Sequence, residues 1–251
     1  MKLDSYAQNI YSQNGEDGII SEIINRIKDK VVLTNWVCEF GAWDGKHLSN
    51  TFLLIEKGVH AVLIESDTNR FIDLEKTVGQ FPKIVAINKE VSRSSDDMNS
   101  LDKILKDTEI PTDFDLLSID IDSYDLDVWE SLVNFTPKLV IIEINSRILP
   151  GIKWRHTEFT PGNSFSSTIS VAKNKGYTPI CHTGNLIFIR NDLLAFVGIE
   201  RRFIDYPELL FNAQWIESRE SKLMNDPRTL IRLIGVFFLG VVRKILRSTK
   251  F

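Results

Sequence analysis

The sequence has few cysteines, no apolar run long enough to span a bilayer, and no strong excess of charge of one sign. Its 251 residues include two cysteines, Cys38 and Cys181, which lie far apart in apolar stretches. We therefore expect reduced core thiols in a cytoplasmic protein and not a disulfide framework. The N-terminal segment has no apolar stretch of the kind found in secretory signals. A net charge of −4 gives no overall case for nucleic acid as the partner.

The uninterrupted apolar run between Arg232 and Arg243 contains ten residues, too few for a membrane-spanning helix, which needs about 20. Residues 201–251 hold ten Lys or Arg against five Asp or Glu. On a helix over about 229–247, one face of about 100° collects most of the basic side chains. These are Arg228, Arg232, Arg243, Arg247 and Lys250. We predict a basic amphipathic C-terminal extension that binds an anionic membrane surface, or that packs on its own domain or on a second copy of the chain.

The rest of the chain is typical of a globular protein, with 43% hydrophobic and 25% charged residues. After a helix at 16–28, short apolar strands alternate with helices, which indicates a parallel sheet covered on both faces. Strands are expected at 36–40, 61–65, 84–88, 115–120 and 139–144. Helices are expected at 48–57, 68–78, 97–107 and 125–134. A helix at 164–175 and a hairpin of strands 177–182 and 185–190 complete the Rossmann-like α/β organisation of class I methyltransferases.

A glycine-containing turn follows the first expected strand. Residues 37–45 carry Glu39, Gly41 and Gly45 at E-x-G-x-x-x-G spacing, and glycine lets the backbone bend and approach a ligand closely. Glu65 ends the next strand about 20 residues later, where an acid can hydrogen-bond a ribose. The pattern predicts a nucleoside-type cofactor. A G-x-G-x-x-G motif is missing, which weakens the interpretation as a dinucleotide-dependent oxidoreductase.

Acidic and amide residues occur where the expected strands end. They are Glu39, Glu65, Asn88, Asp120 with Asp122, and Glu143 with Asn145. Helix capping accounts most readily for one further acid, Asp125. Carboxylates that converge on one sheet edge repel one another unless a cation offsets them. The pattern therefore indicates a ligand site at this edge.

Several segments resemble the FkbM-type S-adenosylmethionine-dependent methyltransferases. The residues that carry the resemblance are 12–18 (SQNGEDG), 39–45 (EFGAWDG), 63–65 (LIE), 118–122 (SIDID) and 142–145 (IEIN). It covers residues 10–195 and implies a methyltransferase domain over 1–200, followed by the extension 201–251. By this resemblance Gly41 and Gly45 line the methionine end of the cofactor, Glu65 holds the ribose and Asn88 lies near the adenine. Relatives often have glycine where this chain has Ser123.

The resemblance also implies O-methylation of sugars and other small hydroxylated metabolites. An alcohol ionises too weakly at neutral pH to attack the methyl group, so a base or a metal is needed. We expect Asp120 and Asp122 to be catalytic. With Glu143 and Asn145 they could also bind Mg²⁺, which prefers oxygen ligands. Alternatively, Asp120 contacts the cofactor's ammonium group and Glu143 is a satisfied buried acid.

His156 lies in the loop after the fifth strand, where an acceptor would enter. It is either a general base or a surface histidine without function. The leading hypothesis is a cytoplasmic O-methyltransferase for a surface glycan or a lipid-linked precursor, located peripherally at the inner membrane face by its tail. The alternative is a non-catalytic scaffold that keeps the cofactor fold and recruits partners through its C-terminal helix; an oligomer is compatible with either.

Overall fold

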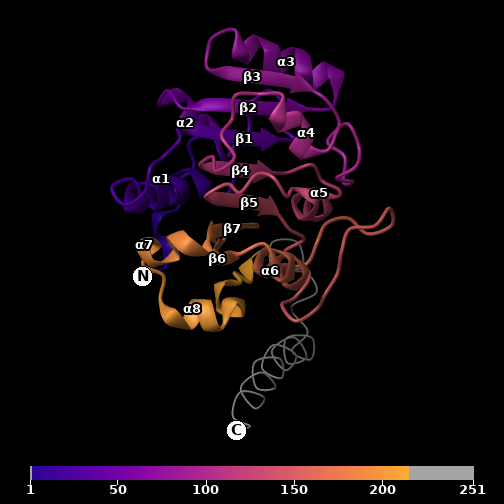
Figure 1. Cartoon of the computed structure of the whole chain (residues 1–251). Coiled ribbons are helices and arrows are strands. Elements are labelled where there is room, and N and C mark those ends of the chain that lie inside the picture. Colours follow the sequence, from indigo (N-terminus) through magenta and orange to yellow (C-terminus); the bar gives the residue numbers. More distant parts are fainter. Residues whose placement is uncertain (1, 215–251) are drawn as a thin grey trace.

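A computed structural model describes residues 2–214, which form a seven-stranded sheet with helices on both faces (Figure 1). The strand order is β3-β2-β1-β4-β5-β7-β6, and β7 runs antiparallel to both of its neighbours. The strands are β1 (Trp36–Phe40), β2 (His60–Glu65), β3 (Ile84–Asn88), β4 (Leu116–Ile119), β5 (Leu139–Glu143), β6 (Tyr177–His182) and β7 (Asn185–Arg190). The expected class I methyltransferase fold is confirmed by this order, in which the hairpin inserts its second strand beside β5.

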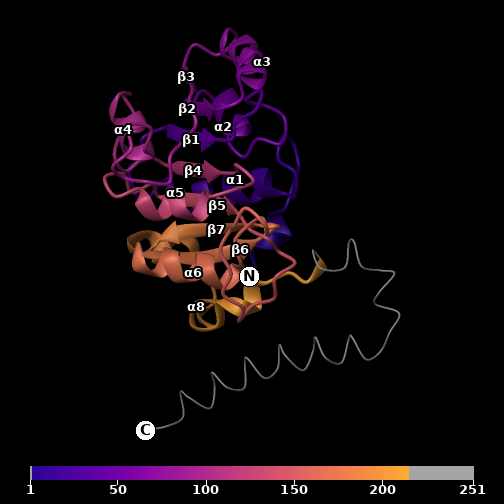
Figure 2. The same cartoon turned by 90° about the vertical axis from the view of Figure 1, so that its right-hand side faces the viewer.

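The helices divide between the two faces of the sheet (Figure 2). On one face lie α4 (Leu101–Lys106), α5 (Asp125–Ser131) and α6 (Phe165–Asn174). On the other lie α1 (Glu16–Ile27), α2 (Phe52–Glu56), α3 (Thr68–Val78) and α7 (Leu194–Val197). The short helix α8 (Arg201–Asp205) and the 3₁₀ turns η1 (Leu3–Tyr6), η2 (Asn191–Leu193) and η3 (Pro207–Leu210) complete the described chain.

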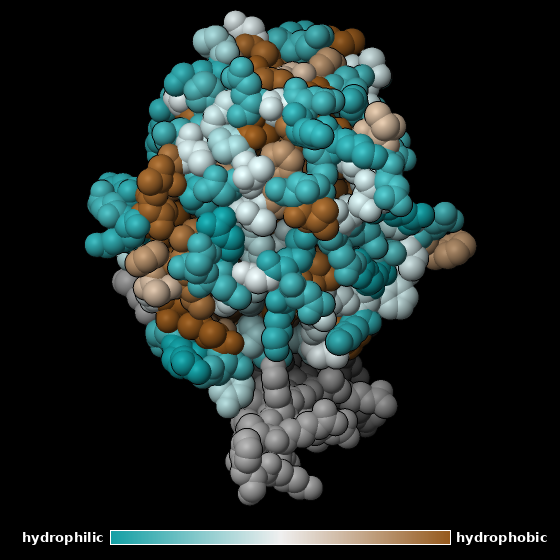
Figure 3. Space-filling model, in the orientation of Figure 1, coloured by the Kyte–Doolittle hydropathy of each residue, from teal (hydrophilic) through white to brown (hydrophobic). Residues whose placement is uncertain are grey.

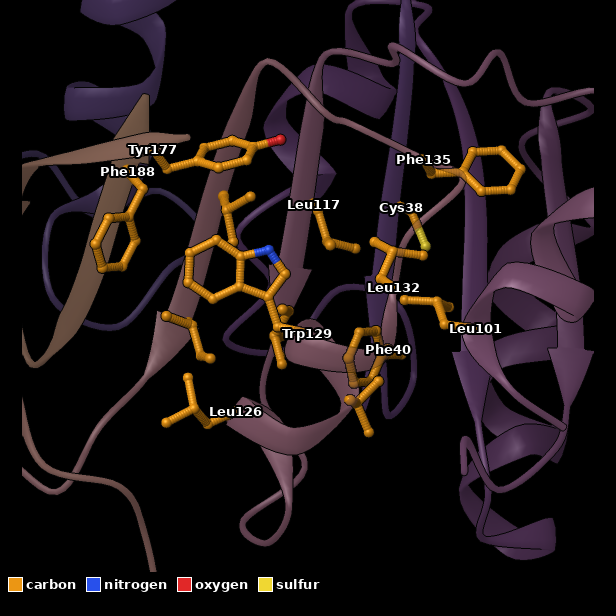
Figure 4. Packing of buried hydrophobic residues seen from close by; sticks show 14 of the residues in the cluster. Cys38, Phe40, Leu101, Leu117, Leu126, Trp129, Leu132, Phe135, Tyr177 and Phe188 are labelled. Atoms are coloured by element: carbon orange, nitrogen blue, oxygen red, sulfur yellow. The ribbon is translucent and has the colours of Figure 1, made fainter. Parts of the chain in front are cut away.

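Successive side chains of each strand point to opposite faces of the sheet, and so contribute to two hydrophobic cores, one on each face. In β1, Cys38 and Phe40 pack toward α4 and α5, whereas Val37 packs toward α1 and α2. Trp129 of α5 is fully buried and contacts Tyr177 at 5.6 Å and Phe188 at 5.1 Å between ring centroids (Figure 4). Large apolar surfaces removed from water on both faces hold the sheet edge, and hence the site, in place.

The outer surface is mainly hydrophilic on the face shown in Figure 3, where hydrophobic side chains lie in separate groups. Within residues 2–214, no helix combines the length and the apolar character needed to cross a membrane. Cys38 and Cys181 are free and buried, and burial raises the pKa of both thiols, that of Cys181 to about 12. The two cysteines are thus core thiols, as expected.

The helix expected at 48–57 begins only at Phe52. Leu48 has a left-handed backbone with φ 58°, which a helix cannot contain. The Asp44 carboxylate accepts the N–H groups of Lys46 and His47, and so forms a turn before the helix. Helical periodicity alone could not detect this turn, because its hydrogen bonds come from polar side chains.

The first part of the expected C-terminal extension packs on the same domain. Phe203 of α8 is buried, and the Phe211 ring stacks on His182 of β6 at 4.8 Å between centroids. The predicted basic helix over 229–247 lies outside the described residues.

Candidate functional site

Two cavities lie side by side at the carboxyl ends of the parallel strands, where open α/β sheets bind ligands. The first, of about 540 Å³, lies beyond β1, β2, β3 and β4 and is lined by residues that include Gly41, Ser66, Lys89, Arg93 and Tyr124. The second, of about 380 Å³, lies beyond β4, β5 and the β6–β7 turn. Both volumes fall in the range of small-molecule sites.

The segment 120–123 separates the two cavities. Ile121 and Ser123 line the first cavity, while Asp120 and Asp122 line the second. The Asp125 carboxylate accepts the N–H groups of Ile121 at 2.8 Å and of Ser123 at 3.0 Å, which fixes this alternation. Successive residues of this short segment therefore face two different cavities.

Two backbone conformations shape this segment. Asp122 has φ 56°, a left-handed conformation that is unusual for a residue with a side chain. Gly41 has φ 78°, and a Cβ at this position would lie 1.7 Å from the carbonyl oxygen of Asp120. The glycine is therefore required for the contact between the end of β1 and the end of β4.

Three predicted carboxylates meet in the second cavity. Oxygen atoms of Asp120, Asp122 and Glu143 all lie within 4.8 Å of one another. Desolvation, then the charges of Asp125 and Asp122, raise the pKa of Asp120 to about 7. Desolvation and the charge of Asp120 raise the pKa of Glu143 to about 8. The Asp120 side chain keeps contact with solvent, and the nearby negative charges favour the protonated form of each carboxyl group.

Amide side chains form most of the remaining polar lining of the second cavity. They are Gln13, Asn14, Asn50, Asn145 and Asn185. Only Asn145 was predicted as a site residue; its Nδ2 donates to the Pro161 carbonyl at 3.1 Å. The others come from segments far apart in the sequence, so no local spacing could identify them.

Glu16 joins two of these segments. Its buried carboxylate accepts the N–H of Asn14 at 2.8 Å, the hydroxyl of Thr183 at 2.6 Å and the amide of Asn185 at 3.1 Å. Next to it, Asp17 accepts four hydrogen bonds from residues 10–12. Hydrogen bonds from the 12–18 motif therefore connect the rim of the second cavity to the β6–β7 turn.

Glu39 is enclosed by the protein. Its carboxylate accepts from Ser49 and Thr51 hydroxyls at 2.6 Å each, from the N–H of Asn50 at 3.0 Å and from Ser118 at 3.2 Å. Desolvation raises its pKa, and these hydrogen bonds oppose the rise. Glu39 shapes the loop that presents Asn50, and its predicted direct contact with a cofactor stays a prediction.

The other predicted cofactor residues lie around the first cavity. Glu65 accepts the N–H groups of Trp43 and Asp67, both at 2.8 Å. Asn88 donates to the Glu65 carbonyl at 2.8 Å. Gly45 makes room for the side chains of Leu74 and Leu63 and is not part of the cavity lining. Of the predicted set, Gly41 lines the first cavity directly, and Glu65 and Asn88 support its edge at Ser66 and Lys89.

His156 lines neither cavity. Its Nδ1 accepts the N–H of Gly162 at 3.1 Å, and its ring packs 4.7 Å from Tyr124, which lines the first cavity. A neutral ring with this contact carries its proton on Nε2. The structure thus does not bring His156 to the three carboxylates, and its role as a base stays a prediction.

Ser146 is a lining residue that the sequence did not reveal. Its hydroxyl lies 2.8 Å from Nε2 of His182 and donates to the Gly184 carbonyl at 3.0 Å. Nδ1 of His182 accepts the N–H of Asn212, so Nε2 bears the proton and donates to Ser146. Burial lowers the pKa of His182 to about 4. His182 therefore orients Ser146 and does not act as its base.

No family model and no curated protein match the sequence. Among solved structures, the chain is similar to M. capricolum TrmK in complex with S-adenosyl-homocysteine (14% identity, 90% of this chain and 95% of that one, TM-score 0.48). It is also similar to Streptococcus pneumoniae Sp1610, a putative tRNA (m1A22) methyltransferase (13% identity, 86% of this chain and 97% of that one, TM-score 0.46). A third similar structure is the citrinin polyketide synthase CMeT domain (12% identity, 72% of this chain and 54% of that one, TM-score 0.47).

The chain thus spans about half the length of the polyketide synthase domain. At these identities and TM-scores the similarities carry no argument about function. The assignment to the methyltransferase fold rests on the strand order of the sheet.

Proposed function

We propose that this chain is an S-adenosylmethionine-dependent O-methyltransferase that modifies a hydroxyl of a sugar or glycan. The observation that carries the proposal is the segment 120–123, which separates a cavity at the glycine turn from a cavity lined by carboxylates. We place the methyl donor in the first cavity and the acceptor in the second, so that the sulfonium methyl meets the acceptor oxygen where the two cavities adjoin at this segment, and the bond to sulfur breaks as the bond to oxygen forms. Such alignment supplies much of the catalysis in a displacement reaction.

The first cavity fits the cofactor. Its lining includes Gly41, which directly follows β1, and its polar rim includes Ser66, which follows the acid that ends β2. When bound, the cofactor supplies a methyl group on a positively charged sulfur. The contributions of Glu65 and Asn88 are to hold the turn at Trp43 and the end of β3 in place around it.

The second cavity fits a hydroxylated acceptor. Five amide side chains offer both donors and acceptors, as neighbouring hydroxyl groups require. Asp120 or Asp122 accepts the proton of the reacting hydroxyl, because both carboxylates line this cavity close to Glu143. A sugar acceptor also agrees with the FkbM-type family, which the sequence motifs resemble and which we include in the proposal.

The proposal includes a Mg²⁺ ion bound by the same carboxylates. Asp120, Asp122 and Glu143 offer three hard oxygen ligands at close range, and Asn145 lines the same cavity. A divalent ion would offset their mutual repulsion and lower the pKa of a bound hydroxyl.

The test combines binding and turnover. Calorimetry with S-adenosylhomocysteine should show binding to the wild-type chain and to Asp122→Asn alike. Radiolabelled S-adenosylmethionine and a panel of methyl glycosides should give transfer with the wild type and with the exposed control Asp73→Asn, but not with Asp122→Asn.

Several results would change the proposal. Absence of cofactor binding would support the scaffold alternative, and an active Asp122→Asn variant would remove the carboxylate from the chemistry. Full activity in excess chelator would exclude the metal while leaving the rest intact.

A further inference from the structure

A groove of about 270 Å³ lies outside both cavities, between the loop after β5 and helices α5 and α6. Its lining includes Trp154 and Arg155 from the loop, Glu130 from α5, and Ser170 and Asn174 from α6. We call it the Trp154 groove. None of its residues lines either of the two cavities at the sheet edge.

Two hydrogen bonds to Ser164 hold the backbone of Trp154 in place. Its N–H donates to the Ser164 hydroxyl, and its carbonyl accepts the N–H of Ser164, both at 2.9 Å. Ser164 is the N-cap of α6, so the loop is attached to the start of this helix. Trp154 as a whole residue is nevertheless 37% exposed. An aromatic side chain on a fixed backbone is a preorganised contact surface that loses little freedom on binding.

The charge of the groove is largely neutralised. Nη2 of Arg155 lies 3.0 Å from an oxygen of Asp127 and 2.6 Å from an oxygen of Glu130. Lys153 is the other cation of the lining. Because the guanidinium already has two carboxylate partners, the groove is poorly suited to phosphate or nucleic acid.

Two unused hydrogen-bonding groups line the same groove as Trp154. Ser170 and Asn174 are exposed and four residues apart, so they share one face of α6. Within residues 2–214 their side chains make no hydrogen bond. The groove thus combines an aromatic face with a hydroxyl and an amide that are free to bind a ligand.

We propose that the Trp154 groove binds a pyranose ring, which stacks its C–H face on the indole and directs its hydroxyls to Ser170 and Asn174. The negative face of the indole attracts the slightly positive C–H groups, and the hydroxyls pair with a side chain of each polarity. Sugar binding here is independent of methyl transfer. The groove would also serve as a distal subsite for a longer glycan acceptor, and only this second role rests on the proposed function.

The indole N–H signals of the full-length chain test the proposal by NMR. The chain has five tryptophans, and Trp154→Phe assigns the relevant signal. Methyl glycosides of mannose, galactose, rhamnose and N-acetylglucosamine are added separately up to high millimolar concentration. At least one should shift the Trp154 signal in a saturable manner, while the other four indole signals show that the fold is unchanged.

Matched variants separate specific binding from a general solvent effect. The double variant Ser170→Ala/Asn174→Ala should weaken the affinity about tenfold, the effect of losing two hydrogen bonds. Phe159→Ala should bind as the wild type does, because Phe159 is 94% exposed on the same loop but is not part of the groove lining.

The proposal is overturned if no glycoside shifts the Trp154 signal or if the double variant binds as tightly as the wild type. It is also overturned if a single-stranded RNA oligomer shifts the signal and no glycoside does. S-adenosylhomocysteine in a separate titration reports on the first cavity. Loss of that response alone would contradict the proposed function and leave the sugar-binding groove standing.

Discussion

A Cβ added to Gly41 would lie 1.7 Å from the carbonyl oxygen of Asp120, and this close approach joins the glycine turn to the carboxylate segment. The two residues directly follow β1 and β4, which are neighbours in the sheet, although 79 positions separate them in the chain. Any change at Gly41 must therefore move the segment that carries Asp120 and Asp122.

Gly41→Ala should destabilise the protein and weaken S-adenosylhomocysteine binding. A side chain at φ 78° costs about 1–2 kcal/mol, and the clash with Asp120 adds about 1–3 kcal/mol. Gly176→Ala is a matched control, because Gly176 has φ 80° but a Cβ at that position would meet no atom within 4 Å. Urea unfolding should show a clearly larger loss for Gly41→Ala; equal losses would mean that the contact is not important for stability.

Glu65→Ala should weaken S-adenosylhomocysteine binding by about 1–3 kcal/mol, the effect of losing hydrogen bonds to a charged group. The carboxylate holds the N–H groups of Trp43 and Asp67 at the edge of the first cavity. Calorimetry compares this variant with Glu75→Ala, whose side chain is exposed on α3. Unchanged affinity in Glu65→Ala would exclude a role for this acid in cofactor binding.

The free energy of unfolding should fall as the pH is lowered from about 6.5 toward 4, in part because of His182. Burial lowers the pKa of this histidine to about 4 in the folded state. The unfolded state therefore binds the proton first, and stability that is complete above pH 6.5 is lost as the pH falls through this window. The contribution of His182 is roughly 3 kcal/mol.

Denaturant titrations at several pH values can isolate this contribution. His182→Gln should lower stability at neutral pH but make it less dependent on pH between 6.5 and 4. His47→Gln, a change on an exposed loop, keeps His182 and should retain the wild-type profile. Identical pH profiles for His182→Gln and the wild type would show that another group causes the loss.

A chain ending near Asn225 should fold and bind S-adenosylhomocysteine but lose affinity for anionic liposomes. The segment it removes contains the apolar run and the basic residues of 228–251, and each basic residue near an anionic surface contributes about 1 kcal/mol. Sedimentation of the full-length and shortened chains at low and high salt measures the difference. Equal sedimentation, or unfolding of the shortened chain, would contradict the membrane hypothesis.

Local sequence pattern was sufficient to predict most of the fold. The run 36–40 matches β1 residue for residue, because a central strand covered on both faces is mainly apolar. The run 84–88 matches β3 as well, although this edge strand leaves Val85 exposed. The periodicity of 68–78 likewise matches α3, whose N-cap Asp67 binds the N–H groups of Asn69 and Arg70. Each of these signals lies within a few residues of the structure it predicts.

The composition of the carboxylate cluster was also predictable, because parallel strands all end at the same edge of the sheet. Asp120 and Asp122 follow β4, Glu143 ends the neighbouring strand β5, and the three carboxylates do meet there. Only the tertiary structure decided that Asp120 and Ile121 face different cavities, since this depends on the hydrogen bonds from Asp125. It also decided that Asn14 and Asn185 share one cavity, because the buried carboxylate of Glu16 joins segments that no sequence spacing relates.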